Sequence, residues 1–125
     1  MKVGANLKKL LLIEDDCFMR EMVTMVLESE NFEVVGAETG AEALRLLQEC
    51  AGCDAVIADM YLPDTDGLEL FEQINAIYPE AMFVMLSSET DQKIVSKADS
   101  LGIKYIFKDE NFAESIVTTL QTVSK

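Results

Sequence analysis

Histidine is absent from this chain of 125 residues, and basic residues are few. Without histidine a Ser-His-Asp hydrolase is excluded, because no imidazole could act as the base beside a serine. The chain has ten Lys and Arg residues and 23 Asp and Glu residues, which gives a formal net charge of −13. Such an acidic chain, with no local basic patch, would be repelled by phosphate backbones and anionic membranes. We therefore expect no nucleic-acid partner.

Long apolar runs and nucleotide-binding glycine motifs are also missing. The longest mainly apolar run, around Leu10–Ile13, is far below the ~18 residues of a membrane span, and residues 1–6 contain no apolar signal core. Neither G-x-G-x-x-G nor G-x-x-x-x-G-K-[ST] occurs, so the usual dinucleotide and triphosphate fingerprints are excluded. Three cysteines, an odd number, indicate a reducing compartment without disulfides. We expect a cytoplasmic protein with no membrane segment.

Two of the cysteines form a CxxC motif, Cys50-Ala51-Gly52-Cys53. A redox CxxC begins a helix after a strand, whereas this one follows a helical pattern. No second Cys or His pair is available to complete four zinc ligands. We interpret the motif as a helix terminus that turns through Gly52.

Short apolar runs alternate with amphipathic segments along the whole chain. The alternation is typical of parallel strands joined by crossover helices. The predicted strands are Leu10–Ile13, Phe32–Ala37, Ala55–Ala58, Met82–Leu86 and Tyr105–Phe107. The expected fold is a doubly wound α/β sheet of five parallel strands with five helices, in one domain over residues 1–125 with a flexible lead-in at 1–6.

The predicted helices carry apolar residues three and four apart, which should form a stripe that faces the sheet. In chain order these are Phe18, Met22, Met25 and Val26; Ala43, Leu44 and Leu47; Leu70, Phe71, Ile74 and Ile77; Ile94, Val95, Ala98 and Leu101; and Phe112, Ile116, Val117, Leu120 and Val123. Gly102 should end the fourth helix.

Polar residues follow the predicted strands at the edge where an open α/β sheet places its ligands. They are Glu14-Asp15-Asp16, Asp59, Ser87-Ser88 and Lys108. If the first and third strands are neighbours, three carboxylates converge and need a cation. Oxygen ligands without histidine favour Mg²⁺ over zinc, copper or iron. An aspartate beside Mg²⁺, with a hydroxyl and an ammonium group opposite, has the groups that phosphoryl transfer requires.

Two segments resemble the acidic pair and the phosphoacceptor loop of response-regulator receivers. They are Leu11-Leu12-Ile13-Glu14-Asp15-Asp16 and Asp59-Met60-Tyr61-Leu62-Pro63-Asp64-Thr65-Asp66-Gly67. Arg20, six residues after Glu14, also fits the pattern. The likeness spans nearly the whole chain and implies a two-component receiver of the stand-alone chemotaxis type, flavodoxin-like, with strand order 2-1-3-4-5.

By this resemblance, Asp59 is the nucleophile that takes a phosphoryl group from a sensor histidine kinase or a phosphotransfer protein. Glu14, Asp15, Asp59 and the backbone carbonyl of Tyr61 would hold Mg²⁺. The chain would catalyse its own phosphorylation and slow dephosphorylation. Asp16 is interpreted as the N-cap of the first helix rather than as a ligand, because aspartate is favoured at that position.

The resemblance also implies a switch. Ser87 would supply the hydroxyl that bonds the phosphoryl group, Lys108 would contact that group, and Tyr105 would change rotamer when the hydroxyl moves. The alternatives are a solvated strand end for Lys108 and a core aromatic for Tyr105. A downstream partner would dock on the face formed by the fourth helix, fifth strand and fifth helix.

The sequence departs from the family pattern at three places. Ser87 replaces the usual Thr, which keeps the hydroxyl but loses the stiffness of a β-branched residue. Asp109 follows Lys108 where a cis proline is usual, so we expect a trans bond and a rebuilt loop. The stretch from Gly102 to Lys108 is one residue shorter than the common family pattern. The altered lysine loop leaves open a degenerate receiver that acts as a phosphorylation-independent adaptor. A receiver that is part of a longer protein is a separate alternative, which the sequence does not distinguish.

Overall fold

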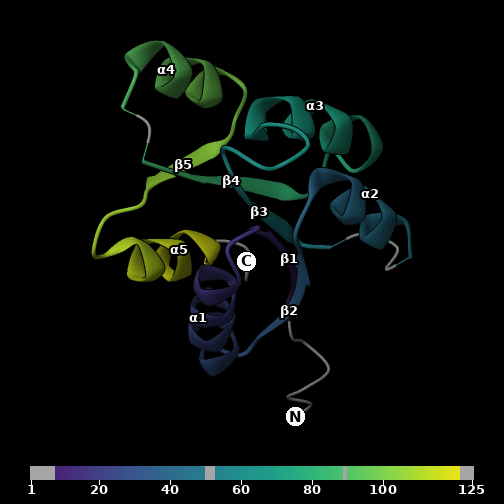
Figure 1. Ribbon diagram of the computed structural model, residues 1–125, viewed down its shortest axis with the longest axis vertical. Coiled ribbons are helices and arrows are strands. Elements are labelled where there is room, and N and C mark those ends of the chain that lie inside the picture. The colour runs from purple at the N-terminus through teal and green to yellow at the C-terminus, as the bar shows by residue number, and fades with distance from the viewer. Residues whose placement is uncertain (1–7, 50–52, 89, 122–125) are drawn as a thin grey trace.

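Five β-strands and five α-helices alternate in the computed structural model, which describes residues 8–49, 53–88 and 90–121 (Figure 1). The strands are β1 (Lys8–Ile13), β2 (Phe32–Ala37), β3 (Ala55–Asp59), β4 (Met82–Ser87) and β5 (Lys104–Phe107). The helices are α1 (Cys17–Ser29), α2 (Gly40–Glu49), α3 (Gly67–Ile77), α4 (Gln92–Ser100) and α5 (Phe112–Leu120). No helix within these ranges is long and apolar enough to cross a membrane.

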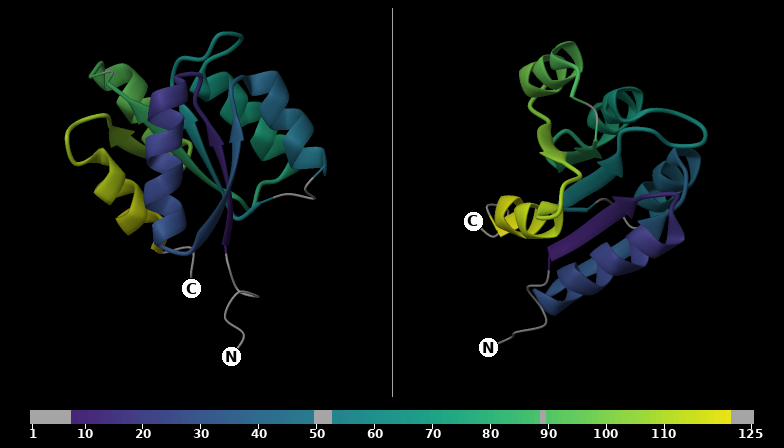
Figure 2. Two further views of the ribbon diagram at one scale, coloured as in Figure 1. Left: turned by 60° about the horizontal axis from the view of Figure 1, so that its bottom comes forward. Right: turned by 60° about the vertical axis from the view of Figure 1, so that its left-hand side comes forward.

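All strand pairs are parallel, and the sheet order is β2-β1-β3-β4-β5, which confirms the predicted fold and strand order. The order reverses at β1, because β2 lies on one side of it and β3 on the other. In Figure 2, left, the arrowheads of β1, β2 and β3 point the same way. The carboxyl ends of the strands therefore meet at one edge of the sheet.

The core has two layers, because alternate residues of each strand point to opposite faces of the sheet. Leu11 and Ile13 of β1 pack with the buried residues of α2, α3 and α4, whereas Leu10 and Leu12 pack with those of α1 and α5. Figure 1 shows the same division, with α2, α3 and α4 on one side of the sheet and α1 and α5 on the other. Both faces are covered, as the continuous apolar strands predicted.

The predicted apolar stripe of α1 is wrong at Phe18 and Met25, whereas Met22 and Val26 are half-buried as predicted. Phe18 and Met25 are 76% and 70% exposed, and the buried residues of this helix are Val23 and Leu27. The helix carries apolar side chains on two faces, and the period of 3.6 residues fits either one. Ile77 of α3 is also exposed, whereas the other predicted stripe residues within the described ranges are buried or half-buried.

Three predictions concern residues at the margins of the described ranges. The lead-in at residues 1–6, three residues of the CxxC motif (50–52) and Val123 lie outside the described residues.

Gly102 follows α4 with φ of +83°, a left-handed conformation that favours glycine, and this confirms its predicted role as a helix terminator.

A side chain from the loop after β3 caps the start of α2. The Asp64 carboxylate accepts hydrogen bonds from the backbone N–H of Gly40 at 2.9 Å and of Ala41 at 3.0 Å. These N–H groups belong to the first turn of α2, which has no intrahelical partners for them. A Cβ on Gly40 would lie 2.6 Å from the Thr65 methyl carbon, so the glycine allows the loop to approach the helix. The loop that follows Asp59 is thereby fixed to α2.

We predict that Asp64→Ala lowers the free energy of unfolding by about 1 kcal/mol, the usual contribution of a helix cap. Asp64→Asn should lose less, since the amide keeps one acceptor oxygen. The hydrogen bonds from the N–H groups of Gly40 and Ala41 hold the pKa of Asp64 below its usual value. The stabilisation is therefore complete above the unfolded-state pKa of about 3.9 and is lost as pH falls through the lower folded-state pKa.

Urea unfolding of the three proteins at pH 7 and at pH 3 measures this effect. Glu72→Gln, which changes an exposed carboxylate on α3, is the matched control. Equal stability of Asp64→Ala and the native protein at pH 7 would contradict the capping role.

Candidate functional site

Backbone hydrogen bonds continue beyond the strand ends and fix the polar residues there. The N–H of Glu14 donates to the carbonyl of Ala37 at 3.0 Å, and the N–H of Lys108 donates to the carbonyl of Ser87 at 2.9 Å. Between them, the N–H of Met60 donates to the carbonyl of Leu86 at 2.8 Å. The chain segments that carry the predicted site residues are therefore held side by side at the carboxyl edge of the sheet.

The three predicted carboxylates meet at this edge. Glu14 is buried, Asp15 is exposed and Asp59 is half-buried, and one oxygen from each carboxylate lies within 4.8 Å of the others. An all-oxygen set of this kind, with one ligand open to solvent, fits a hard divalent cation such as Mg²⁺, which usually keeps several waters. The expectation that these three residues come together is confirmed by the geometry.

Lys108 is the cation that faces this cluster. Its Nζ lies 2.8 Å from Asp59 Oδ1 and 3.3 Å from Glu14 Oε1. Burial lowers the pKa of Lys108, but the hydrogen bonds and ion pairs with Asp59 and Glu14 outweigh burial and raise it above its usual value. Lys108 is therefore charged at neutral pH, and its interpretation as a merely solvated strand end is wrong.

One lysine does not balance three carboxylates. Burial, helped by the nearby charge of Asp15, raises the pKa of Asp59 in spite of the hydrogen bond from Lys108. Burial and the charge of Asp59 likewise raise the pKa of Glu14, although the N–H of Asp16 donates to its carboxylate at 3.2 Å. The ionised forms of Asp59 and Glu14 are thus less stable in the folded protein than in water.

The remaining predicted residues lie on β4, on β5 and in the loops that follow β1 and β3. Ser87 ends β4 and is 2% exposed, and the ring of Tyr61 is exposed while its backbone bridges to Asp66. The ring of Tyr105 packs edge-on against Phe107, with centroids 5.3 Å apart. Asp16 accepts a hydrogen bond from the N–H of Met19 at 3.1 Å, which confirms it as the N-cap of α1. The roles of Ser87, Tyr105 and the Tyr61 carbonyl stay predictions.

The backbone and side chain of Asp109 both make hydrogen bonds in the loop after β5. Every described peptide bond is trans, as expected for the bond between Lys108 and Asp109. The N–H of Asp109 donates to the carbonyl of Phe107 at 2.9 Å, a bond that a proline could not make. Its carboxylate accepts from the N–H of Asn111 at 2.9 Å, next to the start of α5. Asp109 thus supports the turn that carries Lys108.

Sequence reasoning did not assign a contact to two residues that support the site. Asp64 caps α2 from the phosphoacceptor-like loop, and a Pro-Asp-Thr-Asp-Gly segment indicates only a turn. Arg20 donates from Nη1 to the backbone carbonyl of Glu14 at 2.7 Å. Its spacing of six residues from Glu14 was the one available signal, and it says nothing about which atom the arginine contacts.

We predict that Asp59→Asn raises the free energy of unfolding at pH 7 when divalent ions are removed. A carboxyl whose pKa is raised by folding favours the folded state below its unfolded-state pKa, and this benefit is lost as pH rises through the folded-state pKa. At pH 7 the ionised Asp59 therefore destabilises the protein, and an amide removes that cost.

Urea unfolding in the presence of a chelator, at pH 7 and at pH 4, measures the difference. The gain in the free energy of unfolding of Asp59→Asn over the native protein should shrink at the lower pH, where native Asp59 takes up a proton more readily. The control Glu72→Gln should leave stability nearly unchanged. A variant less stable than the native protein at pH 7 would mean that the Lys108 ion pair outweighs burial and repulsion.

Comparison with known proteins gives one family. A family model described as the response regulator receiver domain matches residues 10–120. The chemotaxis protein CheY of Listeria monocytogenes is 35% identical over 118 residues, which cover 94% of this chain and 98% of that protein. The chemotaxis protein CheY of Bacillus subtilis is 32% identical over 117 residues, which cover 90% and 97%.

Solved structures agree with the sequence comparison. A response regulator receiver domain protein from Clostridium thermocellum has a TM-score of 0.86 at 27% identity, over 94% of each chain. The chemotaxis response regulator CheY4 of Vibrio cholerae has a TM-score of 0.83 at 29% identity, over 94% of this chain and 98% of that one. With the matched family model, the sheet order and the acidic cluster at the expected edge, the chain belongs to the response regulator receiver domain family.

Proposed function

We propose that this receiver is switched by phosphorylation of Asp59 in a magnesium-dependent reaction. The observation that carries the proposal is the meeting of the Asp59, Glu14 and Asp15 carboxylates with the ammonium group of Lys108 at one edge of the sheet. The same groups argue against the alternative of a phosphorylation-independent adaptor, which has no need to keep a destabilising acidic cluster beside a lysine.

The chemistry assigns each residue a task. An Asp59 oxygen attacks the phosphorus of a phosphohistidine, so the P–N bond breaks as the O–P bond of an acyl phosphate forms. Glu14, Asp15, Asp59 and the Tyr61 carbonyl would hold Mg²⁺, which when bound neutralises charge on the phosphoryl oxygens. Lys108, now 2.8 Å from Asp59, is close enough to contact the transferred group.

The switch follows from differential contact. A phosphoryl group shifts a two-state equilibrium only by what it gains in the active form over the inactive one. Ser87, buried at the end of β4, and Lys108 are the donors that would supply this difference, and Tyr105 would change rotamer with Ser87. The signal would then reach the face formed by α4, β5 and α5.

The partners belong to the same proposal. A sensor histidine kinase or a phosphotransfer protein would donate the phosphoryl group, and a downstream protein would bind the α4-β5-α5 face in the cytoplasm. The relatives named above are chemotaxis proteins, which supports a role as a stand-alone regulator of this type. The net charge of −13 favours partners with basic docking surfaces.

We predict that incubation with a small phosphodonor and Mg²⁺ adds one phosphoryl group, and that Asp59→Asn abolishes the reaction, because an amide is not a nucleophile. Mass spectrometry of the intact protein and of its peptides measures both results. The product should be alkali-labile, as an acyl phosphate is. Glu72→Gln should react like the native protein, whereas label on Ser87 or Ser88 would reject the mechanism.

We further predict that Ser87→Ala and Lys108→Ala weaken the conformational response more than the phosphorylation itself. Beryllofluoride with Mg²⁺ is the phosphoryl mimic, and amide chemical shifts from 103 to 117 report on the proposed face. Lys93→Ala, which changes an exposed lysine of α4, is the matched lysine control. If Lys108→Ala gave the same shift changes as the native protein, the lysine would have no part in the switch.

A further inference from the structure

Both backbone groups of Glu14 are fixed, each by a different element. Its N–H donates to the carbonyl of Ala37 at the end of β2, and its carbonyl accepts from Arg20 Nη1 at 2.7 Å. This carbonyl belongs to the peptide unit that joins Glu14 to Asp15. Its orientation therefore decides the direction in which Asp15 leaves the strand, and Asp15 is the exposed carboxylate of the acidic cluster.

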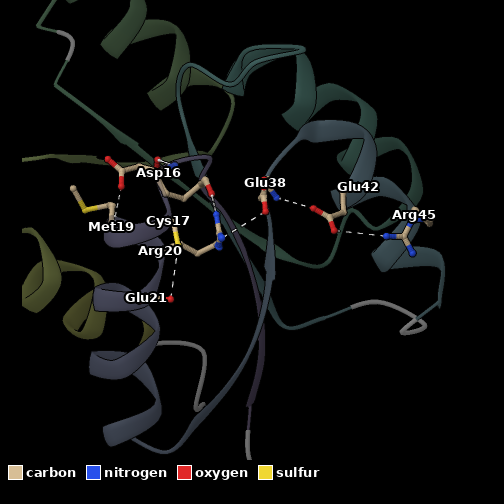
Figure 3. Close-up of polar contacts among 9 residues, drawn as sticks. Asp16, Cys17, Met19, Arg20, Glu21, Glu38, Glu42 and Arg45 are labelled. Atoms are coloured by element: carbon tan, nitrogen blue, oxygen red, sulfur yellow. Dashed lines mark hydrogen bonds and ion pairs between the residues drawn. The ribbon is translucent and has the colours of Figure 1, made fainter.

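Arg20 reaches this carbonyl from α1 along a constrained path. Its side chain is only 19% exposed, and its Nη2 lies 3.6 Å from Glu38 Oε2, just beyond the end of β2. The stem passes over Gly36, where an added Cβ would lie 3.3 Å from Arg20 Cδ. Figure 3 shows Arg20 extending from α1 toward Glu38.

Glu38 is in turn connected to α2. Its backbone N–H donates to Glu42 Oε1 at 2.8 Å, and Glu42 Oε2 lies 3.7 Å from Arg45 Nη2 (Figure 3). The second anchor of Arg20 thus sits on a strand end that α2 holds in place. The guanidinium is a planar, rigid group, so its hydrogen bond to the Glu14 carbonyl and its ion pair with Glu38 hold it in one orientation, whereas a lysine ammonium is a point charge on a flexible stem.

We propose that Arg20 is a positioning residue for the cation site: it fixes the peptide between Glu14 and Asp15 so that the Asp15 carboxylate faces Asp59, with Gly36 leaving room for its stem. The inference rests on the proposed function for the use of Mg²⁺, but it concerns the shape of the metal-free loop. Arg20 touches neither the phosphoryl group nor the ion.

Geometry and charge predict opposite results when Arg20 is removed. As a positive charge near three carboxylates, Arg20 opposes cation binding, so its loss should raise the affinity for Mg²⁺ if charge were its only effect. If Arg20 is a positioning residue, its loss should lower the affinity for Mg²⁺, because outer partners that orient metal ligands typically contribute about 10–100-fold to that affinity. The sign of the change separates the two roles.

The experiment compares Arg20→Met with Lys97→Met. Methionine keeps an unbranched stem over Gly36 and removes the donors. Lys97 is an exposed lysine on α4, which covers the opposite face of the sheet from α1, so its replacement removes the same charge away from the contacts of Arg20. Magnesium affinity is measured by titration of amide shifts, and the metal-free shifts of 14–17 report on the loop directly.

We expect Arg20→Met to bind Mg²⁺ about tenfold more weakly and to shift the metal-free amides of 14–17, with the Mg²⁺ affinity of Lys97→Met within about twofold of that of the native protein. Arg20→Lys, which restores the charge and one donor, should recover part of the affinity. Unchanged or tighter Mg²⁺ binding by Arg20→Met would overturn the proposal, as would an equal loss of affinity in Lys97→Met.

Two further measurements keep the test decisive. Gly36→Ala displaces the arginine stem without changing charge and should weaken Mg²⁺ in the same direction; together with Arg20→Lys it decides the question if Arg20→Met does not fold. Phosphorylation of the native protein is assayed separately. If the native protein binds Mg²⁺ but takes no phosphoryl group, the proposed function is rejected. The metal-free amide shifts of 14–17 would still test the positioning role of Arg20.

Discussion

The register of the parallel strands is the constraint on which the site depends. Ile13 pairs with Ala58 and Asp59 pairs with Leu86, so β1, β3 and β4 end at nearly one level. The polar residues at these strand ends therefore lie side by side. Side chains alternate between the two faces of a strand, and a slip of one residue would turn Asp59 to the opposite face. Apolar layers on both faces of the sheet prevent that slip. Burial far from the site thus holds together carboxylates that repel one another.

The acidic cluster shows how function and stability oppose each other in this fold. Burial and mutual repulsion raise the pKa values of Asp59 and Glu14, and Lys108 compensates only in part. Proteins commonly retain such unfavourable arrangements where activity requires them. Arg20 acts on the same cluster from outside, through a backbone carbonyl, and so can shape it without neutralising it.

The sequence predicted the sheet well because its strands are short, continuous apolar runs whose ends carry polar residues. It predicted α1 badly, since Phe18 and Met25 fit a helical period as well as the truly buried Val23 and Leu27 do. Period alone does not say which stripe faces the sheet; the packing partners decide it. The contact of Asp64 with α2 was beyond sequence reasoning for a related reason, because it joins positions 23 and 24 residues apart.

The two edges of the sheet have a consequence for behaviour in concentrated solution. An edge strand offers unpaired backbone groups that can pair with another molecule, and proteins limit this hazard with short edges and charged side chains. Here β5 has four residues and begins with exposed Lys104, and β2 carries exposed Glu33 and the exposed Gly36 beneath the arginine stem. Gly36, which makes room for Arg20, thus lies on an edge strand, so a substitution there would alter both the arginine contact and an exposed edge of the sheet.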